Sequence, residues 1–319
     1  MGTVAITGAS GFLGGHLAEA LREEGWRVRA IVRAGSPWTA PGGVERVEAS
    51  LDVDELSRAA DGADVLVHSA ALVRAPSERV FEATNVGGTR AAVGAANSTG
   101  ARLVYISSQA AAGTGTIARP RSEDDPPRPV TAYGRSKLAG EEVVRAHAQG
   151  PWTIVRPVAI YGPRDRGFLP LFRMAARGFF PLVSEPQASF SLIHVREAVL
   201  GIRMAFSDRA DRQTFFLTRP PPVGARVLLE AIALAVGRRF RPLQVPPMAL
   251  RALARCGDVA WRLGVQPALD STRFAELRGE GFVCTADRAF ERLGFRAETS
   301  LSEGVAETAR WYRQHGWLP

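Results

Sequence analysis

The sequence predicts an α/β protein: a doubly wound, mostly parallel sheet followed by a smaller mixed α/β domain. Short β-branched runs alternate with alanine-rich helical stretches through the first half of the chain, as crossover helices between parallel strands require. A glycine-rich turn follows the first of these runs, and the alternation ends after about residue 161. We therefore expect residues 1–161 to form the first domain and residues 162–319 the substrate domain, with some later segments returning to the first sheet.

The first half contains the elements of this sheet in order along the chain. The expected strands are residues 3–7, 28–33, 44–48, 65–68, 103–107 and 152–156. The expected helices are residues 11–24, 53–60, 80–99 and 133–148. Proline and arginine between residues 119 and 129 predict a loop that leads the chain into the last of these helices.

The second half has fewer strands and more irregular stretches. Residues 162–186 are rich in glycine, proline and phenylalanine and are expected to be loop-like. Short strands are expected at 212–218 and 241–245, and helices at 195–206, 225–236, 247–263, 286–293 and 302–315. In residues 248–263, Arg251, Arg255 and Arg262 share one helix face. This pattern allows a membrane-surface helix, but we expect an ordinary amphipathic domain helix.

Composition limits the classes of function that the chain can have. It is 46% hydrophobic and 23% charged, which is ordinary for a globular protein with a full core. The net charge is +8, but the arginines are spread among 32 acids, so we expect no nucleic-acid partner. No apolar run approaches the ~20 residues of a membrane span, and the N-terminus has no basic-then-apolar signal segment. We therefore expect a cytoplasmic protein without stable membrane insertion that acts on a small molecule.

The cysteines and histidines do not predict a metal site. Cys256 and Cys284 have no metal-like spacing and are expected to stay reduced. The five histidines are scattered along the sequence. We therefore expect chemistry without a bound metal.

The turn after the first strand predicts a phosphate-binding loop. It reads TGASGFLG over residues 7–14, with glycines at a G-x-x-G-x-x-G spacing. A helix that begins here offers free backbone N–H groups and the positive end of its dipole to a phosphate. The place between a strand and a helix is typical of a Rossmann-type dinucleotide fold. We expect cofactor contacts from Gly8, Ser10, Gly11, Phe12, Leu13 and Gly14.

The end of the second strand bears on which dinucleotide binds. In dinucleotide folds an acid at this position binds the ribose hydroxyls of NAD. Here the residue is Arg33, and no acid follows until Glu45. Arginine can hold a 2′-phosphate through two hydrogen bonds, whereas an acid would repel it. We therefore expect NADP(H) to be preferred, with NAD(H) possible; in the alternative, Arg33 stacks on adenine or faces solvent.

Tyr133 and Lys137 predict acid–base chemistry. They are four residues apart and share a helix face, and Lys137 is the only lysine in a chain with 39 arginines. A nearby cation lowers the pKa of a tyrosine and makes it usable near neutral pH. Ser107 and Ser108 follow a strand, where α/β folds hold ligands, and either hydroxyl could bind the reacting oxygen. Asn85 could hold a water that carries protons onward from Lys137.

These residues belong to motifs that span nearly the whole chain. The sequence resembles the extended short-chain dehydrogenase/reductases, the NAD-dependent epimerase/dehydratase-like group. The motifs are TGASGFLG (7–14), HSAA (68–71), TNVGGT (84–89), VYISSQ (104–109), YGRSK (133–137), RPVAIYGPRD (156–165) and SLIHV (191–195). The resemblance implies a catalytic Ser108, Tyr133 and Lys137 with Asn85 as a fourth member. It also implies cofactor contacts from Leu51, Ala70, Ala71, Tyr133, Lys137 and Pro157, and pairing of such chains as homodimers.

The chain differs from the motifs of some family members, and these differences suggest to which branch of the family it is most similar. The 4,6-dehydratases carry an acidic pair where this chain has Gln109 and Ala110. Many nucleotide-sugar enzymes carry a diphosphate-binding arginine where it has Phe190, among other apolar residues between 167 and 192. An apolar pocket suits an apolar substrate. We take Gln109, Tyr161 and Phe190 as candidate substrate contacts.

These differences favour a reductase similar to dihydroflavonol-reductase-like and 3β-hydroxysteroid-dehydrogenase-like enzymes. We expect an NAD(P)H-dependent oxidoreductase that interconverts a ketone and a secondary alcohol on an apolar or lipid-like molecule. A nucleotide-sugar 4-epimerase is the alternative, with Arg164, Arg166 or Arg173 replacing the missing arginine. A third, weaker alternative is a dinucleotide-binding protein without catalysis.

Overall fold

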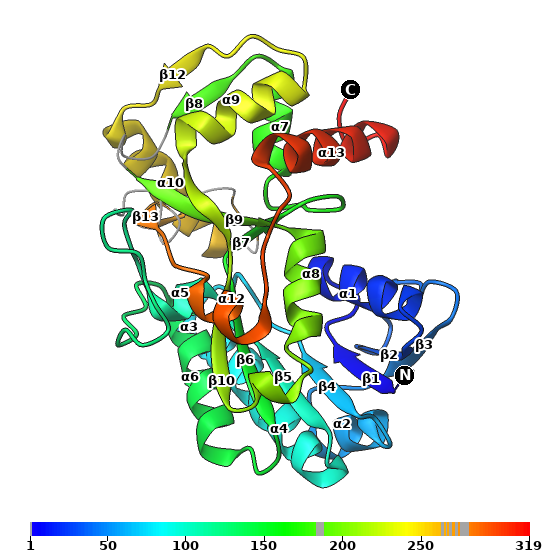
Figure 1. Cartoon of the computed structure of the whole chain (residues 1–319). Helices are drawn as coiled ribbons and strands as arrows, with labels where there is room; N and C mark the ends of the chain where they lie inside the picture. Colours follow the sequence, from blue (N-terminus) through cyan, green and yellow to red (C-terminus); the bar gives the residue numbers. More distant parts are fainter. Residues whose placement is uncertain are drawn as a thin grey trace.

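A seven-stranded sheet, parallel throughout, forms the lower part of the computed structural model (Figure 1). The structure describes residues 2–182, 188–262, 265, 267, 270, 271, 274 and 281–319. The strand order is β10-β6-β5-β4-β1-β2-β3. The strands are β1 (Thr3–Thr7), β2 (Arg27–Val32), β3 (Val44–Glu48), β4 (Val65–His68), β5 (Arg102–Ile106), β6 (Trp152–Pro157) and β10 (Gln213–Leu217). This order is doubly wound, because the chain runs outward from β1 in both directions.

Helices cover both faces of this sheet. One face packs against α1 (Phe12–Glu23), α8 (Val195–Met204) and α12 (Asp287–Leu293). The other face packs against α2 (Val53–Ala60), α4 (Gly87–Thr99) and α6 (Ala132–His147). The inner strands are therefore buried on both faces, which explains why their sequences are largely continuous apolar runs, whereas the edge strand β3 is mostly exposed and carries charged residues.

A second unit lies above the carboxyl ends of the main strands (Figure 1). Its sheet has the order β11-β9-β13, with β7 also paired to β9, and β8 pairs separately with β12. The strands are β7 (Ala159–Tyr161), β8 (Phe180–Leu182), β9 (Ser189–His194), β11 (Arg219–Gly224), β12 (Pro242–Gln244) and β13 (Gly281–Phe282). The helices are α7 (Leu169–Ala176), α9 (Ala225–Ala235), α10 (Pro247–Arg262) and α13 (Leu301–Gln314).

The expected strands and helices of the first half are confirmed, most within a residue of their bounds. The expected helix at 80–99 is interrupted, because α3 (Glu78–Phe81) leads into a π-helix at Glu82–Val86 before α4 begins. The chain returns to the main sheet through β10, which was expected as a strand at 212–218. Residue 263, the last of the helix expected at 247–263, lies outside the described residues.

The expectation of a loop over residues 162–186 was wrong for its central part. Helix α7 and strand β8 lie there, and Phe172 and Phe180 are buried. Pro170 looked like a helix breaker, but it occupies the first turn of α7, where a helix loses no hydrogen bond to proline. Residues 183–186 of the expected loop lie outside the described residues.

Candidate functional site

The turn between β1 and α1 has glycine at positions where a side chain would collide with the neighbouring backbone. Gly8 has φ +72°, and a Cβ added there would lie 2.7 Å from the backbone nitrogen of Ala70. A Cβ on Gly14 would collide with the carbonyl of Gly8. Gly11 is the N-cap of α1, so the first-turn N–H groups of Phe12 and Leu13 face the turn without intrahelical partners. This cradle fits a phosphate group at a helix N-terminus, as the sequence predicts.

The loop after β4 is fastened to this turn through Thr7. The Thr7 hydroxyl accepts a hydrogen bond from the Ala70 N–H at 3.2 Å and lies 2.8 Å from His68 Nδ1. Burial, with a smaller effect of the Lys137 charge, lowers the pKa of His68 to about 3. A neutral imidazole therefore holds Ala70 and Ala71 beside the phosphate turn.

Arg33, Leu51 and Pro157 each lie at or just beyond the end of a strand of the main sheet. Arg33 directly follows β2, the neighbour of β1, and is exposed. Leu51 lies near α4, because a Cβ added to Gly88 would be 2.7 Å from its Cδ1. Pro157 is buried as the last residue of β6.

Helix α6 brings Tyr133 and Lys137 to the carboxyl edge of the sheet. The Thr131 hydroxyl caps this helix by accepting the Gly134 N–H at 3.0 Å. Lys137 is only 2% exposed, and its Nζ lies 4.2 Å from the centre of the Tyr105 ring. Burial lowers the pKa of Lys137 to about 7, although the Glu141 carboxylate acts in the opposite direction. The site therefore contains a buried lysine that can change its charge near neutral pH.

The two adjacent serines after β5 have different surroundings. The Ser107 hydroxyl donates to Glu141 Oε1 at 2.6 Å and is buried. Ser108 is the N-cap of α5 (Gln109–Ala112), is half-buried, and its hydroxyl accepts the Ala110 N–H at 3.2 Å. The hydroxyl proton of Ser107 is committed to Glu141, which leaves Ser108 as the better candidate to bind a reacting oxygen.

Helix α5 packs closely on the first turn of α6. A Cβ added to Gly134 would collide with the carbonyl of Ala110, so glycine is needed next to Tyr133. Gln109 is buried, and within the described residues its Nε2 has no hydrogen-bond partner. A buried amide donor without a partner is costly, which is consistent with the sequence prediction that Gln109 contacts a ligand.

Asn85 lies in the π-helix and clamps the loop after β4. Its Oδ1 accepts the Leu72 N–H at 2.8 Å, and its Nδ2 donates to the Leu72 carbonyl at 3.0 Å and the Ser136 hydroxyl at 2.9 Å. These bonds engage the whole side-chain amide. The proton-relay role of Asn85 stays a prediction, while its structural role is to tie the loop to the turn of α6 between Tyr133 and Lys137.

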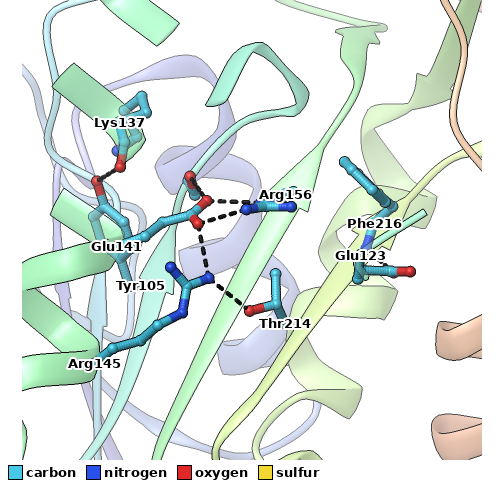
Figure 2. A network of polar contacts seen from close by, with 9 residues as sticks. Tyr105, Glu123, Lys137, Glu141, Arg145, Arg156, Thr214 and Phe216 are labelled. Atoms are coloured by element: carbon cyan, nitrogen blue, oxygen red, sulfur yellow. Dashed lines mark hydrogen bonds and ion pairs between the residues drawn. The ribbon is translucent and has the colours of Figure 1, made fainter. Parts of the chain in front are cut away.

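A buried network of ion pairs joins helix α6 to strand β6, and it was not predicted from the sequence (Figure 2). Glu141 is fully buried, and its carboxylate accepts two hydrogen bonds from Arg156, at 2.8 and 2.7 Å, and one from Arg145 at 2.9 Å. Burial would raise the pKa of Glu141, but the bonds and charge of Arg156 hold it below its usual value. The available signal was the spacing, since Glu141 is one helical turn beyond Lys137.

The remaining candidate contacts lie in the second unit. Tyr161 is buried in its core, 5.4 Å from the His194 ring, and a Cβ added to Gly304 would lie 2.5 Å from its hydroxyl. Phe190 is half-buried on β9, in register with Val223. The structure brings Ser108, Gln109, Tyr133 and Lys137 together through α5 and α6, but it holds Tyr161 within a separate core.

Comparison with known proteins gives one family and several full-length relatives. The model of the NAD dependent epimerase/dehydratase family matches residues 4–215. A ceramide reductase of Caulobacter vibrioides is 34% identical, covering 100% of this chain and 96% of that protein. The 4-hydroxy-2-methyl-3-oxo-4-farnesyl-3,4-dihydroquinoline-1-oxide ketoreductase of Stigmatella aurantiaca is 31% identical, covering 94% and 93%. The UDP-glucose 4-epimerase of Thermotoga maritima has a similar fold, with a TM-score of 0.80, 19% identity, and coverage of 98% and 99%.

Proposed function

This chain belongs to the NAD dependent epimerase/dehydratase family, and we propose that it is an NADP(H)-dependent reductase of ketones on apolar or lipid-like molecules. The observation that carries the proposal is the buried lysine one helical turn from Tyr133, beside a half-buried Ser108. The family and its reductase relatives are those of an NAD(P)-dependent oxidoreductase.

In the direction of reduction, the nicotinamide of the bound dinucleotide supplies the hydride. The Ser108 hydroxyl donates a hydrogen bond to the carbonyl oxygen of the substrate and fixes its position. Tyr133 donates a proton to the same oxygen as the alcohol forms. Lys137 stabilises the resulting tyrosinate, since a cation nearby lowers the pKa of a tyrosine. The turn at Gly8 and Gly11 holds the pyrophosphate and thereby orients the reacting parts.

The preference for a phosphorylated dinucleotide is supported by Arg33. It is exposed directly after β2, in the position from which a side chain reaches the adenosine ribose in folds of this kind. A guanidinium there suits a 2′-phosphate. Equal or tighter binding of NADH than of NADPH would refute this part of the proposal.

An apolar substrate is supported by the surroundings of the arginines that could otherwise hold a diphosphate. Arg164 donates to both carboxylate oxygens of Glu19, at 2.6 and 2.8 Å. Arg166 stacks over the Trp317 ring at 5.2 Å, and Arg173 donates to the Trp317 carbonyl at 3.2 Å. All three are engaged within the protein. The two relatives described as reductases of a ceramide and of a farnesylated ketone point the same way.

The test is a screen of NADPH oxidation over long-chain ketones, small ketones, aldehydes and UDP-sugars, with purified wild type and Tyr133→Phe. We expect turnover on an apolar ketone and a loss of about 10²-fold or more in kcat for Tyr133→Phe. Unchanged turnover in that variant would refute the mechanism. The fold shared with UDP-glucose 4-epimerase keeps a nucleotide-sugar 4-epimerase as second candidate. Conversion of UDP-sugars, with a dinucleotide that stays bound through purification, would favour it.

A further inference from the structure

Helix α10 exposes apolar residues on its outward face in addition to those that it buries. Its inward face consists of Leu250, Ala254 and Gly257, which are buried and spaced one turn apart. Met248, Leu253 and Val259 point outward and are 82%, 57% and 52% exposed. Of the eight exposed residues from 248 to 261, six are apolar: Met248, Ala249, Ala252, Leu253, Cys256 and Val259.

Helix α13 shows what an ordinary face looks like in the same protein. Its exposed residues are all polar: Ser302, Glu303, Arg310, Arg313 and Gln314. Scattered exposed apolar residues are normal, but a contiguous exposed apolar face marks an interaction site. The outward face of α10 is therefore expected to bind a partner. The charged residues near this face indicate the chemistry of that partner.

The stretch of sequence that contains this face is strongly basic. Its two other exposed positions are Arg251 and Arg255, one turn apart, so positive charge borders the apolar residues along the helix. Between Glu230 and Asp270 the sequence has six arginines and one acid, a net charge of +5 compared with +8 for the whole chain. The one acid, Asp258, already accepts the Ser271 N–H at 3.0 Å.

We propose that this face of α10 docks on the surface of a lipid bilayer with anionic headgroups. Apolar side chains bordered by arginines suit an interfacial helix, since the former enter the acyl boundary and the latter meet phosphate. A nucleic acid would need the charge but not the exposed Met248 and Val259. A protein interface is enriched in aromatic residues, and the exposed residues of α10 from 248 to 261 include none. Leu243 on β12, a few residues before α10 in the chain, is also 48% exposed.

The docking is peripheral. Within the ranges that the structure describes, no helix has the length and apolarity needed to cross a bilayer. A surface contact through one helix face needs neither, because its strength comes from a few buried side chains together with electrostatic attraction.

The chain that follows α10 contacts the loop after β4, which borders the candidate site. The Arg74 guanidinium donates to the carbonyl of Pro267, five residues beyond α10, at 2.7 Å. Leu72 on the same loop is clamped by Asn85. Docking would thus place the mouth of the site at the membrane, a consequence that rests on the proposed function. The docking itself rests only on α10 and its charge.

The test is co-sedimentation of the purified full chain, without dinucleotide or substrate, with sucrose-loaded vesicles. One set contains phosphatidylcholine alone, and the other contains phosphatidylcholine with about 30% phosphatidylglycerol. We expect binding to the second set that weakens as salt is raised. Arg251→Gln with Arg255→Gln should weaken binding roughly 20-fold or more, at about fivefold for each arginine. Met248→Asp should weaken it roughly tenfold or more.

Matched controls lie at the opposite end of the molecule. Arg58 on α2 and Arg90 on α4 are exposed, and Val53 on α2 is 39% exposed (Figure 1). Arg58→Gln with Arg90→Gln, and Val53→Asp, should leave vesicle binding unchanged. Unfolding midpoints in urea establish that every variant is folded, independently of turnover.

Three results would overturn the proposal. The first is no binding to the anionic vesicles at low salt, and the second is equal loss of binding in the α2 and α4 controls. The third is that the protein binds no vesicles but forms a dimer, and that Met248→Asp dissociates this dimer. That result would mean that the face binds a second copy of the chain. A protein that binds vesicles but reduces no ketone would refute the proposed function and leave the docking intact.

Discussion

Replacing Glu141 with glutamine is expected to destabilise the protein far more than its conservative chemistry suggests. The carboxylate is fully buried and accepts four hydrogen bonds, from Ser107, from Arg145 and two from Arg156. Arg156 is itself only 2% exposed. Glutamine keeps the shape but removes the negative charge and replaces one acceptor oxygen by a donor nitrogen. Arg156 would then remain buried without a counter-charge.

The expected loss is about 3–5 kcal/mol, the cost of removing one partner from a buried pair. The Arg145 bond adds little, because that side chain is 38% exposed and can turn to solvent. Against a typical total of about 5–15 kcal/mol, this loss is a large fraction of the free energy of unfolding. We expect the midpoint of unfolding in urea, followed by tryptophan fluorescence, to fall accordingly.

Glu142 provides a matched control, since it is the next residue on α6 and is exposed. Glu142→Gln should change the free energy of unfolding by no more than about 0.5 kcal/mol. Glu141→Met combined with Arg156→Met should recover much of the loss, because apolar pairs often replace buried ion pairs without cost. If Glu141→Gln is as stable as Glu142→Gln, or the double variant is no better than the single one, the reasoning is refuted.

Three further predictions concern the site. Lys137→Arg keeps the charge but should lower kcat about 10²-fold or more, because the planar guanidinium cannot replace a compact ammonium above the Tyr105 ring; activity close to wild type would contradict this. The pKa of His68 is lowered to about 3 by burial, so its neutral form should contribute stability above pH 6.5 that is lost as pH falls toward 3. Urea midpoints for His68→Gln should therefore depend less on pH over that range than those of wild type, and an unchanged dependence would count against it. Arg33→Ala should raise KM for NADPH about tenfold or more with little effect on NADH, and parallel changes for both would be the contrary result.

The sheet was predictable because its strands obey a local rule. Most of the parallel strands are buried on both faces and read as short apolar runs, although the edge strand β3 is largely exposed and charged. Glycine at positions 8, 11 and 14 marks the turn that follows the first strand. The second unit was harder. Strand β13 has only two residues, and its pairing with β9 joins segments some 90 residues apart, which no local pattern reports. Pro170 concealed α7, because a proline in a first turn and a proline in a loop look the same in a sequence.

The candidate site likewise contains residues that local sequence patterns reveal and residues that only the structure reveals. Tyr133, Lys137 and the phosphate turn have fixed spacing on single elements, so they could be found in sequence. The partners that hold them could not, since Thr7, His68 and Asn85 act through contacts between elements 13 to 63 residues apart. The family resemblance already favoured Ser108 over Ser107, and the structure adds a physical reason, because the Ser107 hydroxyl donates to Glu141.

The single lysine can now be compared with a buried arginine in the same helix-and-strand pair. Arg156 and Lys137 are each 2% exposed, but Arg156 has two hydrogen bonds to Glu141, whereas the Lys137 ammonium lies over the ring of Tyr105. An arginine cannot lose its proton in a protein, so it can be buried only where a carboxylate meets it. A lysine can be neutral, and burial lowers the pKa of Lys137 to about 7. In the proposed mechanism the cation at this position is enclosed and responds to charge on a neighbouring tyrosine, a combination that suits lysine better than arginine.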